Sequence, residues 1–378
     1  MKRKWIIVVL LGVLLLNHFP VSADAVGSVS ARNAILMEQE SGRVLYEKNA
    51  HNPERIASIT KIMTALLAIE SGKLKEQVKV SERAAGTEGS SLYLQSGEKI
   101  LLEDLVYGLM LRSGNDAAVA IAEHVGGSLE GFVFLMNKKA EEIGMENTHF
   151  ANPHGLDDHE DHFSTAYDMA LLTRYAMNNE TYRTIAGTKV HRAPNPNESW
   201  DRVWKNKNRL LNGLYKHSTG GKTGYTKRAK RTLVSTAAKD DFELIAVTLN
   251  GPDDWNDHIH MFESGFDDYD IAEIVSKGTI KGIKESFYKG KVYLDHSFDY
   301  PLTSEEEDLV KVEYKLLKPK EQDDREIPDI VGKAEIYLGD EKIKELPVYY
   351  KHQPEEKKSF FDFFRNMFTT VIGLKDNG

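Results

Sequence analysis

Three short strings of residues, far apart along the chain, carry side chains that together could act on a peptide carbonyl. They are Ser-Ile-Thr-Lys at 58–61, Ser-Gly-Asn at 113–115 and Lys-Thr-Gly at 222–224. A serine hydroxyl is a poor nucleophile until a neighbouring base removes its proton. The strings supply a serine, an amine that could take this proton, and a second cation that could hold a substrate carboxylate.

The first string pairs Ser58 with Lys61. Residues three apart on a helix share one face, so these two side chains can touch. Burial lowers the pKa of a lysine, and a second cation such as Lys222 lowers it further, so that a neutral amine becomes available as a base. At a helix N-terminus, Ser58 would also gain from free N–H groups that favour a developing oxyanion. The backbone N–H groups of Ser58 and Tyr225 are the candidate oxyanion donors.

The other two strings predict substrate contacts. Ser113 and Asn115 offer a hydroxyl and an amide, which could relay a proton and hold the peptide bond of a substrate. The Lys222 amine would attract a terminal carboxylate and the Thr223 hydroxyl would donate a hydrogen bond to it. Gly224 would let the backbone lie flat against the ligand.

A second Ser-x-x-Lys string, at 96–99, shows that such a string alone is weak evidence for a catalytic pair. In a chain of this length, such a match is expected roughly once or twice by chance. The copy at Ser96 contains Gly97 and predicts a turn, whereas the copy at Ser58 opens an apolar helical stretch. The Lys-Thr-Gly string occurs once, and the combination of all three strings is a strong signal.

The elements that must position these strings follow the order hairpin, helices, strands. This order predicts an α+β fold, in which one sheet is assembled from both ends of the region and helices pack on it. Ser113 and Asn115 fall in a tight turn between two helices, with Asn115 or Asp116 as the expected N-cap. Predicted helices cover 58–72, 101–111, 117–125, 132–143 and 165–177, and predicted strands cover 32–38, 43–47, 222–225, 232–238 and 242–249.

Beyond a catalytic region at 26–272, the helical periodicity fades. Short apolar runs separated by glycine, proline and acidic turns predict a small β-rich domain at 277–352. A chain of 378 residues with 41% hydrophobic and 28% charged residues is long enough for two globular domains.

Both ends of the chain have membrane-related patterns. Residues 1–25 combine a basic start, twelve apolar residues and a small-residue exit, which is typical of a signal peptide cleaved after Ala23 or Ala25. Twelve helical residues rise about 18 Å, too short for a hydrocarbon core of roughly 30 Å.

At 356–375, apolar residues fill one half of a helix flanked by lysines. This pattern favours an amphipathic helix lying in a membrane interface over a helix packed on the β-rich domain.

Composition and charge narrow the range of partners. The chain has no cysteine, so disulfides and thiolate metal sites are excluded. Its formal net charge of −9 disfavours nucleic acid as a general partner. The loop at 154–162 holds histidines and carboxylates whose spacing could suit zinc, but we interpret it as a solvated turn. The predicted chemistry needs neither a metal nor a cofactor.

The chain resembles a low-molecular-mass penicillin-binding protein, a serine-type D-alanyl-D-alanine carboxypeptidase, of the membrane-associated type found in sporulating bacilli. Besides the three strings, the segments at 30–34, 111–118 and 152–156 look like this family. The resemblance implies a β-lactamase/transpeptidase-like catalytic domain with an antiparallel sheet flanked by helices, then a small all-β domain and a C-terminal amphipathic helix.

For function, the resemblance implies an acyl-enzyme on Ser58 and removal of the terminal D-alanine from peptidoglycan stem pentapeptides. It also implies covalent inhibition by β-lactam antibiotics and a peripheral place on the outer face of the cytoplasmic membrane, held by the C-terminal helix.

Two alternatives share the same strings. A class A-like serine β-lactamase needs a Glu-x-x-Leu-Asn string to activate water; none follows Ser113, and Gly114 stands where those enzymes usually carry aspartate. A non-catalytic β-lactam sensor would normally need a membrane-spanning relay, which the sequence pattern does not predict.

Overall fold

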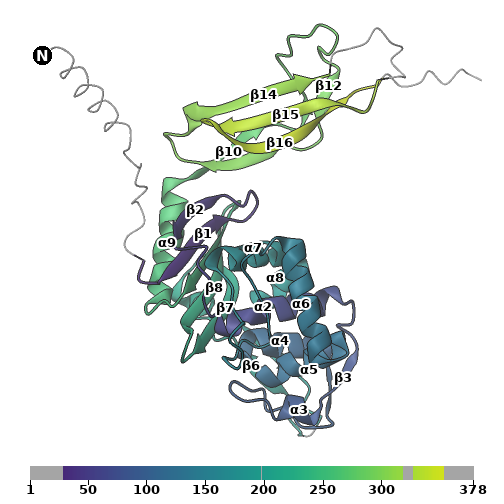
Figure 1. The fold of residues 1–378 in the computed structure, drawn as a ribbon, viewed down its shortest axis with the longest axis vertical. Coiled ribbons are helices and arrows are strands. Elements are labelled where there is room, and N and C mark those ends of the chain that lie inside the picture. The colour runs from purple at the N-terminus through teal and green to yellow at the C-terminus, as the bar shows by residue number, and fades with distance from the viewer. Residues whose placement is uncertain (1–28, 197, 318–326, 353–378) are drawn as a thin grey trace, which may run out of the picture. The chain divides into compact units, whose positions relative to one another are not determined.

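The computed structural model of the chain describes residues 29–196, 198–317 and 327–352 (Figure 1). It divides into two compact units, with the boundary between Ile271 and Ala272. The predicted signal peptide at 1–25 and the predicted amphipathic helix at 356–375 lie outside the described residues. The domain limits 26–272 and 277–352 stay predictions.

The first unit is built on a five-stranded antiparallel sheet with the order β2-β1-β9-β8-β7. The N-terminal hairpin therefore pairs with the last strands of the unit, which confirms the predicted α+β class with a sheet made from both ends (Figure 1). The strands are β1 (Asn33–Glu38), β2 (Val44–Lys48), β7 (Ser218–Thr226), β8 (Lys230–Lys239) and β9 (Phe242–Leu249).

Both faces of this sheet are covered. Along β1, Ile35 and Met37 enter the core formed with most of the helices, whereas Ala34 and Leu36 enter a second core formed with α9. Since successive side chains of a strand point to opposite faces, a strand buried on both sides reads as a continuous apolar run. The helices are α2 (Lys61–Glu70), α3 (Glu82–Ala85), α4 (Leu102–Arg112), α5 (Asn115–Gly126), α6 (Leu129–Ile143), α7 (Ala166–Met177), α8 (Glu180–Ala186) and α9 (Asp254–Asp268).

Small elements connect these layers. A 3₁₀ turn, η1 (Ala57–Thr60), precedes α2, and a π-type turn, η2 (Leu210–Leu214), precedes β7. Two short antiparallel pairs join β3 (Gln77–Lys79) to β4 (Lys99–Leu101) and β5 (Val190–Ala193) to β6 (Arg202–Lys205).

Three local predictions are wrong. Ser58 does not open an α-helix: it lies in η1, and α2 begins at Lys61. The strand that carries Lys222 begins at Ser218, because Gly220 and Gly221 continue the strand where a larger side chain would collide with a neighbouring backbone.

The third error concerns the start of α5. Its N-cap is Gly114, and the helix already includes Asn115 and Asp116. The Asp116 carboxylate instead accepts hydrogen bonds from the backbone N–H groups of Leu92 and Leu94, and so holds the preceding loop. Side chains that could have capped the helix are therefore used in tertiary contacts.

The second unit is a small β domain, as predicted. Its main sheet has the order β11-β12-β16-β15-β14, and β10 pairs with β13. Val331, Ala334 and Val348 are among the fully buried residues of its core. Its elements are β10 (Asp270–Val275), β11 (Gly278–Thr279), β12 (Val292–Leu294), β13 (Phe298–Leu302), η3 (Glu307–Leu309), β14 (Val310–Leu316), β15 (Ile330–Leu338) and β16 (Glu341–Tyr350).

Within the described ranges, no single helix has both the length and the apolar character needed to cross a membrane. The helices α5 and α6 reach those limits only when taken together, and they are bent by 84° at their junction.

Candidate active site

Ser58 lies in η1, between the edge of the sheet and the helical core. Ala57, which precedes it, has a φ of 49°, in the left-handed region. Two hydrogen bonds hold this strained turn. The Thr60 hydroxyl donates to the Ala57 carbonyl at 2.8 Å, and the Thr232 hydroxyl of β8 donates to the Ile56 carbonyl at 3.0 Å. The serine is thus presented by a turn that neighbouring elements keep in place.

Lys61 begins α2 and is fully buried. Its Nζ lies 3.0 Å from Ser58 Oγ, 2.7 Å from Asn115 Oδ1 and 2.6 Å from the His154 carbonyl oxygen. Burial, and then the nearby Lys222 cation, hold the pKa of Lys61 well below its ordinary value. The amine is therefore disposed to be neutral.

A neutral amine has two N–H bonds and one lone pair. The Asn115 amide oxygen and the His154 carbonyl can only accept hydrogen bonds, so they take the two N–H bonds of Lys61. The Asn115 amide is itself oriented, because its Nδ2 donates to the Glu88 carbonyl at 2.6 Å. The remaining lone pair of Lys61 faces the Ser58 hydroxyl, which is the arrangement that general-base activation requires.

Ser113 and Lys222 form the second hydrogen-bonded pair of the site. Ser113 ends α4 with a φ of 66°, and its Oγ lies 3.1 Å from the Nζ of Lys222. Lys222 also donates to the Thr223 carbonyl at 2.7 Å and is only 2% exposed. Burial, together with the Lys207 cation, lowers the pKa of Lys222 to about 7. A carboxylate arriving here would favour the charged form.

Strand β7 brings the third string beside the serine. A Cβ on Gly224 would lie 3.0 Å from the backbone nitrogen of Ser58 and 2.3 Å from the Thr232 hydroxyl, so only glycine allows this approach. Thr223 and Tyr225 flank it, and β7 is an edge strand. Tyr225 is 65% exposed.

All eight residues selected from the sequence therefore lie in one region. Direct contacts join Lys61 to Ser58 and Asn115, and Lys222 to Ser113. The second Ser-x-x-Lys string falls in a turn at Ser96 and Gly97, away from these contacts, and both Ser96 and Lys99 are exposed.

The sequence did not predict the role of the loop at 152–156. Besides the His154 carbonyl on Lys61, the Pro153 carbonyl accepts a hydrogen bond of 2.6 Å from Thr64 in α2. Gly155 has a φ of 84°, and a Cβ there would lie 1.8 Å from the Ala57 carbonyl oxygen. The Pro-His-Gly run signalled a turn, but its contact with the serine turn is long-range and leaves no local pattern.

The histidines of this loop support the same turn. His162 is buried, its Nε2 lies 2.8 Å from the Thr60 hydroxyl, and its Nδ1 accepts from the backbone N–H of Ala151. Burial lowers the pKa of His162 and of His154 to about 3, so both rings are neutral near pH 7. In the part of the chain that the structure describes, no group of three or more histidine, cysteine or acidic side chains is arranged to hold a metal ion.

Lys207 is a second residue that the sequence did not single out. Its side chain is exposed, and its Nζ lies 3.4 Å from the Ser90 hydroxyl. Its charge lowers the pKa of both buried lysines. An isolated lysine in a loop gives no sequence signal for such an effect.

Comparison with known proteins identifies the class. Residues 19–253 match the family model described as D-alanyl-D-alanine carboxypeptidase, and residues 269–356 match the one described as penicillin-binding protein 5, C-terminal domain. The chain therefore belongs to the D-alanyl-D-alanine carboxypeptidase family of low-molecular-mass penicillin-binding proteins, as the three strings indicated.

Individual relatives agree. The chain is 35% identical over 353 residues to the D-alanyl-D-alanine carboxypeptidase DacF of Bacillus subtilis, covering 89% of this chain and 88% of the relative. It is 32% identical to DacC of Escherichia coli, covering 92% and 90%. Penicillin-binding protein 5 of Haemophilus influenzae superposes with a TM-score of 0.72 at 26% identity, covering 86% of this chain and 98% of that one. The prediction of a penicillin-binding serine D-alanyl-D-alanine carboxypeptidase is confirmed, and the β-lactamase and sensor alternatives are not supported.

Proposed function

We propose that Ser58 attacks the carbonyl carbon of the last peptide bond in a peptidoglycan stem pentapeptide ending in D-alanyl-D-alanine. The observation that carries this proposal is the environment of Lys61, whose Nζ donates to Asn115 Oδ1 and the His154 carbonyl, two groups that can only accept, and lies 3.0 Å from Ser58 Oγ. As the Oγ–C bond forms, the hydroxyl proton moves to Lys61 Nζ.

The tetrahedral intermediate places negative charge on the former carbonyl oxygen. The backbone N–H groups of Ser58 and Tyr225 are proposed to bind this oxyanion, since Gly224 brings β7 against the serine turn. When the C–N bond breaks, the proton held by Lys61 passes to the departing amine, and the Ser113 hydroxyl can relay it. Free D-alanine leaves, and the rest of the peptide stays as an ester on Ser58.

Hydrolysis reverses the proton transfers. Water gives a proton to Lys61 as its oxygen attacks the ester carbonyl, and Ser58 recovers a proton as the ester bond breaks. The products are the shortened peptide with a carboxyl terminus and the free enzyme. A β-lactam opens on Ser58 by the same first step and remains attached as a slowly hydrolysed ester.

Lys222 and Thr223 are proposed to bind the terminal carboxylate of the substrate. Lys222 is buried and donates a hydrogen bond to Ser113. A carboxylate would therefore meet an oriented cation with little competing water. This contact selects peptides with a free C-terminus and orients the scissile bond toward Ser58.

We also propose that the chain is exported and acts at the outer face of the cytoplasmic membrane. The pattern of a signal peptide at 1–25 and of an amphipathic helix at 356–375 supports this location. The family's activity supports it as well, because peptidoglycan is assembled outside this membrane.

The decisive test of the catalytic proposal compares two serine variants. Ser58→Ala should abolish both labelling by a fluorescent penicillin and release of D-alanine from diacetyl-lysyl-D-alanyl-D-alanine. Ser96→Ala, in the Ser-x-x-Lys string at 96–99, should leave both unchanged. Labelling that persists in a folded Ser58→Ala protein would assign the nucleophile to another residue.

A further inference from the structure

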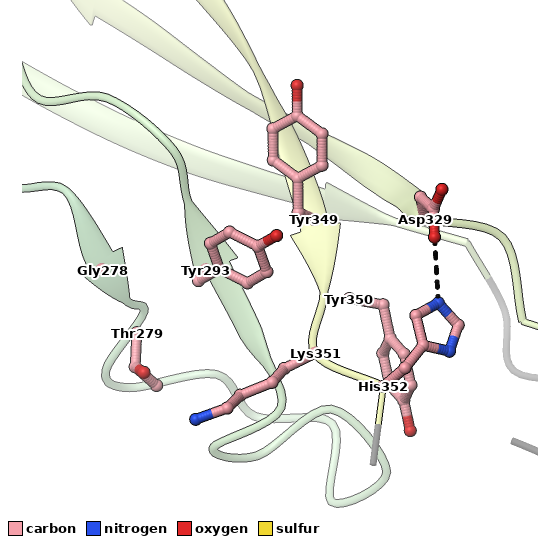
Figure 2. A pocket seen from close by; sticks show the side chains of 8 residues that line it. All are labelled: Gly278, Thr279, Tyr293, Asp329, Tyr349, Tyr350, Lys351 and His352. Atoms are coloured by element: carbon pink, nitrogen blue, oxygen red, sulfur yellow. Dashed lines mark hydrogen bonds and ion pairs between the residues drawn. The ribbon is translucent and has the colours of Figure 1, made fainter. Parts of the chain in front are cut away.

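The β domain has a hollow of about 730 Å³ at the end of β16, beside β11 and β12 (Figure 2). This volume lies within the range of small-molecule binding sites. The family's established chemistry takes place in the other unit, so the hollow has no part in the reaction described above. Its lining combines aromatic rings with groups that can donate and accept hydrogen bonds.

A row of side chains crosses the sheet at this point. Thr279 of β11 pairs with Tyr293 of β12, and Tyr293 pairs with Tyr349 of β16. Ile330 of β15 continues the row opposite Tyr349 and is 50% exposed. Directly paired residues lie on the same face of a sheet. The row is therefore an outward-facing strip, and the alternate residues Val292 and Tyr350 are buried in the core.

The two tyrosine rings at the centre of this strip lie together. Their centroids are 5.5 Å apart with 27° between the planes, and neither ring belongs to the buried core. Both residues are partly buried, so each ring is held in place while part of its surface stays open to a ligand.

Polar groups stand at the edge of the rings. Figure 2 shows Lys351 near Tyr293, and the Asp329–His352 pair, 3.1 Å apart, with the His352 ring against Tyr350. The Asp329 side chain is 89% exposed. The site thus offers an amine and an imidazole as donors, a carboxylate as acceptor, and hydroxyls from threonine and tyrosine that do both.

We propose that this hollow binds the glycan strand of peptidoglycan, a chain of β-1,4-linked N-acetylated hexosamines. The C–H groups on the face of a sugar ring carry slight positive charge and pack on the negative face of an aromatic ring, here Tyr293 and Tyr349. Sugar hydroxyl and N-acetyl groups need both donors and acceptors, which Lys351, His352 and Asp329 supply.

The same lining disfavours an anionic lipid headgroup. A phosphate site gathers donors and cations, whereas the exposed Asp329 carboxylate would repel a phosphate. The choice of glycan also rests on the family's activity, since the stem peptides are attached to such strands. A second contact with the same polymer would raise the concentration of stem peptides near Ser58 without any new contact there.

The test uses full-length protein whose Ser58 has been acylated with benzylpenicillin, so that the peptide site is filled. Binding is measured by co-sedimentation with glycan strands freed of all stem peptides by an amidase, and in solution with chitotetraose. The variant is Tyr293→Ala/Tyr349→Ala. The matched control is Tyr337→Ala, because Tyr337 lies on β15 outside the hollow, where its hydroxyl donates a hydrogen bond of 2.7 Å to Glu335.

We expect acylated wild type and Tyr337→Ala to sediment with bare glycan, and the double variant to bind about tenfold more weakly. Lys351→Gln, an exposed change that leaves the sheet intact, should weaken binding several-fold. All variants should release D-alanine from the soluble tripeptide at the wild-type rate, because this reaction does not use the hollow.

Three outcomes would overturn the proposal. The first is that wild type does not bind bare glycan. The second is that wild type, Lys351→Gln and the double variant bind glycan equally. The third is that the double variant keeps its binding to glycan and instead loses binding to phosphatidylglycerol vesicles. None of them would affect the catalytic proposal, which is tested separately by the penicillin labelling and D-alanine release of Ser58→Ala.

Discussion

Asn115 Oδ1 accepts a hydrogen bond of 2.7 Å from the Nζ of Lys61, and as an amide oxygen it cannot donate one in return. Because an amide oxygen carries no full negative charge, it orients Lys61 while stabilising the ammonium form much less than a carboxylate would. The buried Lys222 cation lowers the pKa of Lys61, since it disfavours a second positive charge nearby. The site thus combines a neutral acceptor and a cation around the one amine that must be a base.

Replacing Asn115 with aspartate should reverse this balance. A carboxylate within hydrogen-bond distance favours the charged form of lysine, so Asn115→Asp should raise the pKa of Lys61 and reduce kcat/KM near pH 7 about 100-fold. The loss relative to wild type should shrink as the pH is raised, because Lys61 of the variant then loses its proton. A pH profile of D-alanine release checks this. A uniform loss at every pH would show that Asn115 acts through substrate contacts alone.

The pKa of Lys222 predicts how kcat/KM changes on the alkaline side of the pH profile. Its pKa is lowered to about 7, so the free enzyme loses this charge as the pH rises through 7. Since a terminal carboxylate needs the charged form, kcat/KM should fall above pH 7, approaching tenfold per pH unit. A substrate ending in D-alaninamide should lack this limb, because it offers no carboxylate. An identical alkaline limb for the two substrates would contradict the assignment of Lys222.

Gly155 and Gly144 offer a matched pair for the loop that positions Lys61. Both have a φ near 85°, but a Cβ on Gly144 would meet nothing within 4 Å, whereas one on Gly155 would lie 1.8 Å from the Ala57 carbonyl oxygen. Gly144→Ala should cost about 1 kcal/mol of stability and keep activity. Gly155→Ala should displace the loop from the serine turn and reduce kcat about 100-fold. Thermal unfolding and D-alanine release measure the two effects. Equal loss of kcat in both variants would refute the role of the loop.

The sequence predicted the parts of this site that depend on residue type and short spacing. Ser58 and Lys61 meet because they are three residues apart, and this held even though the turn is 3₁₀ at the serine. The helix α9 was not predicted, because its polar residues dilute the apolar face that Met261, Phe262 and Phe266 pack on the sheet.

What could not be predicted depends on contacts between distant segments. The His154 carbonyl is a backbone group, and any residue type could have supplied it to Lys61. The cation of Lys207 and the close approach of Gly155 to Ala57 likewise follow from how loops fold over the core. Motifs report side-chain chemistry, whereas backbone carbonyls and packing distances appear only in three dimensions.

The proposed membrane contact can be tested apart from catalysis. Deleting residues 353–378 should release the protein from membranes, because the apolar half of the predicted helix at 356–375 would be lost. The truncated protein should release D-alanine from the soluble tripeptide at the full rate, since Ser58 and its partners lie in the other unit. Within the full chain, Phe361→Ser/Phe364→Ser should weaken vesicle binding, while Asn366→Ser, on the predicted polar half, should not. Vesicle flotation measures the binding of the double variant and of the Asn366→Ser control. Sedimentation of the truncated form with lipid, equal to that of the full chain, would assign membrane binding to another part of the protein.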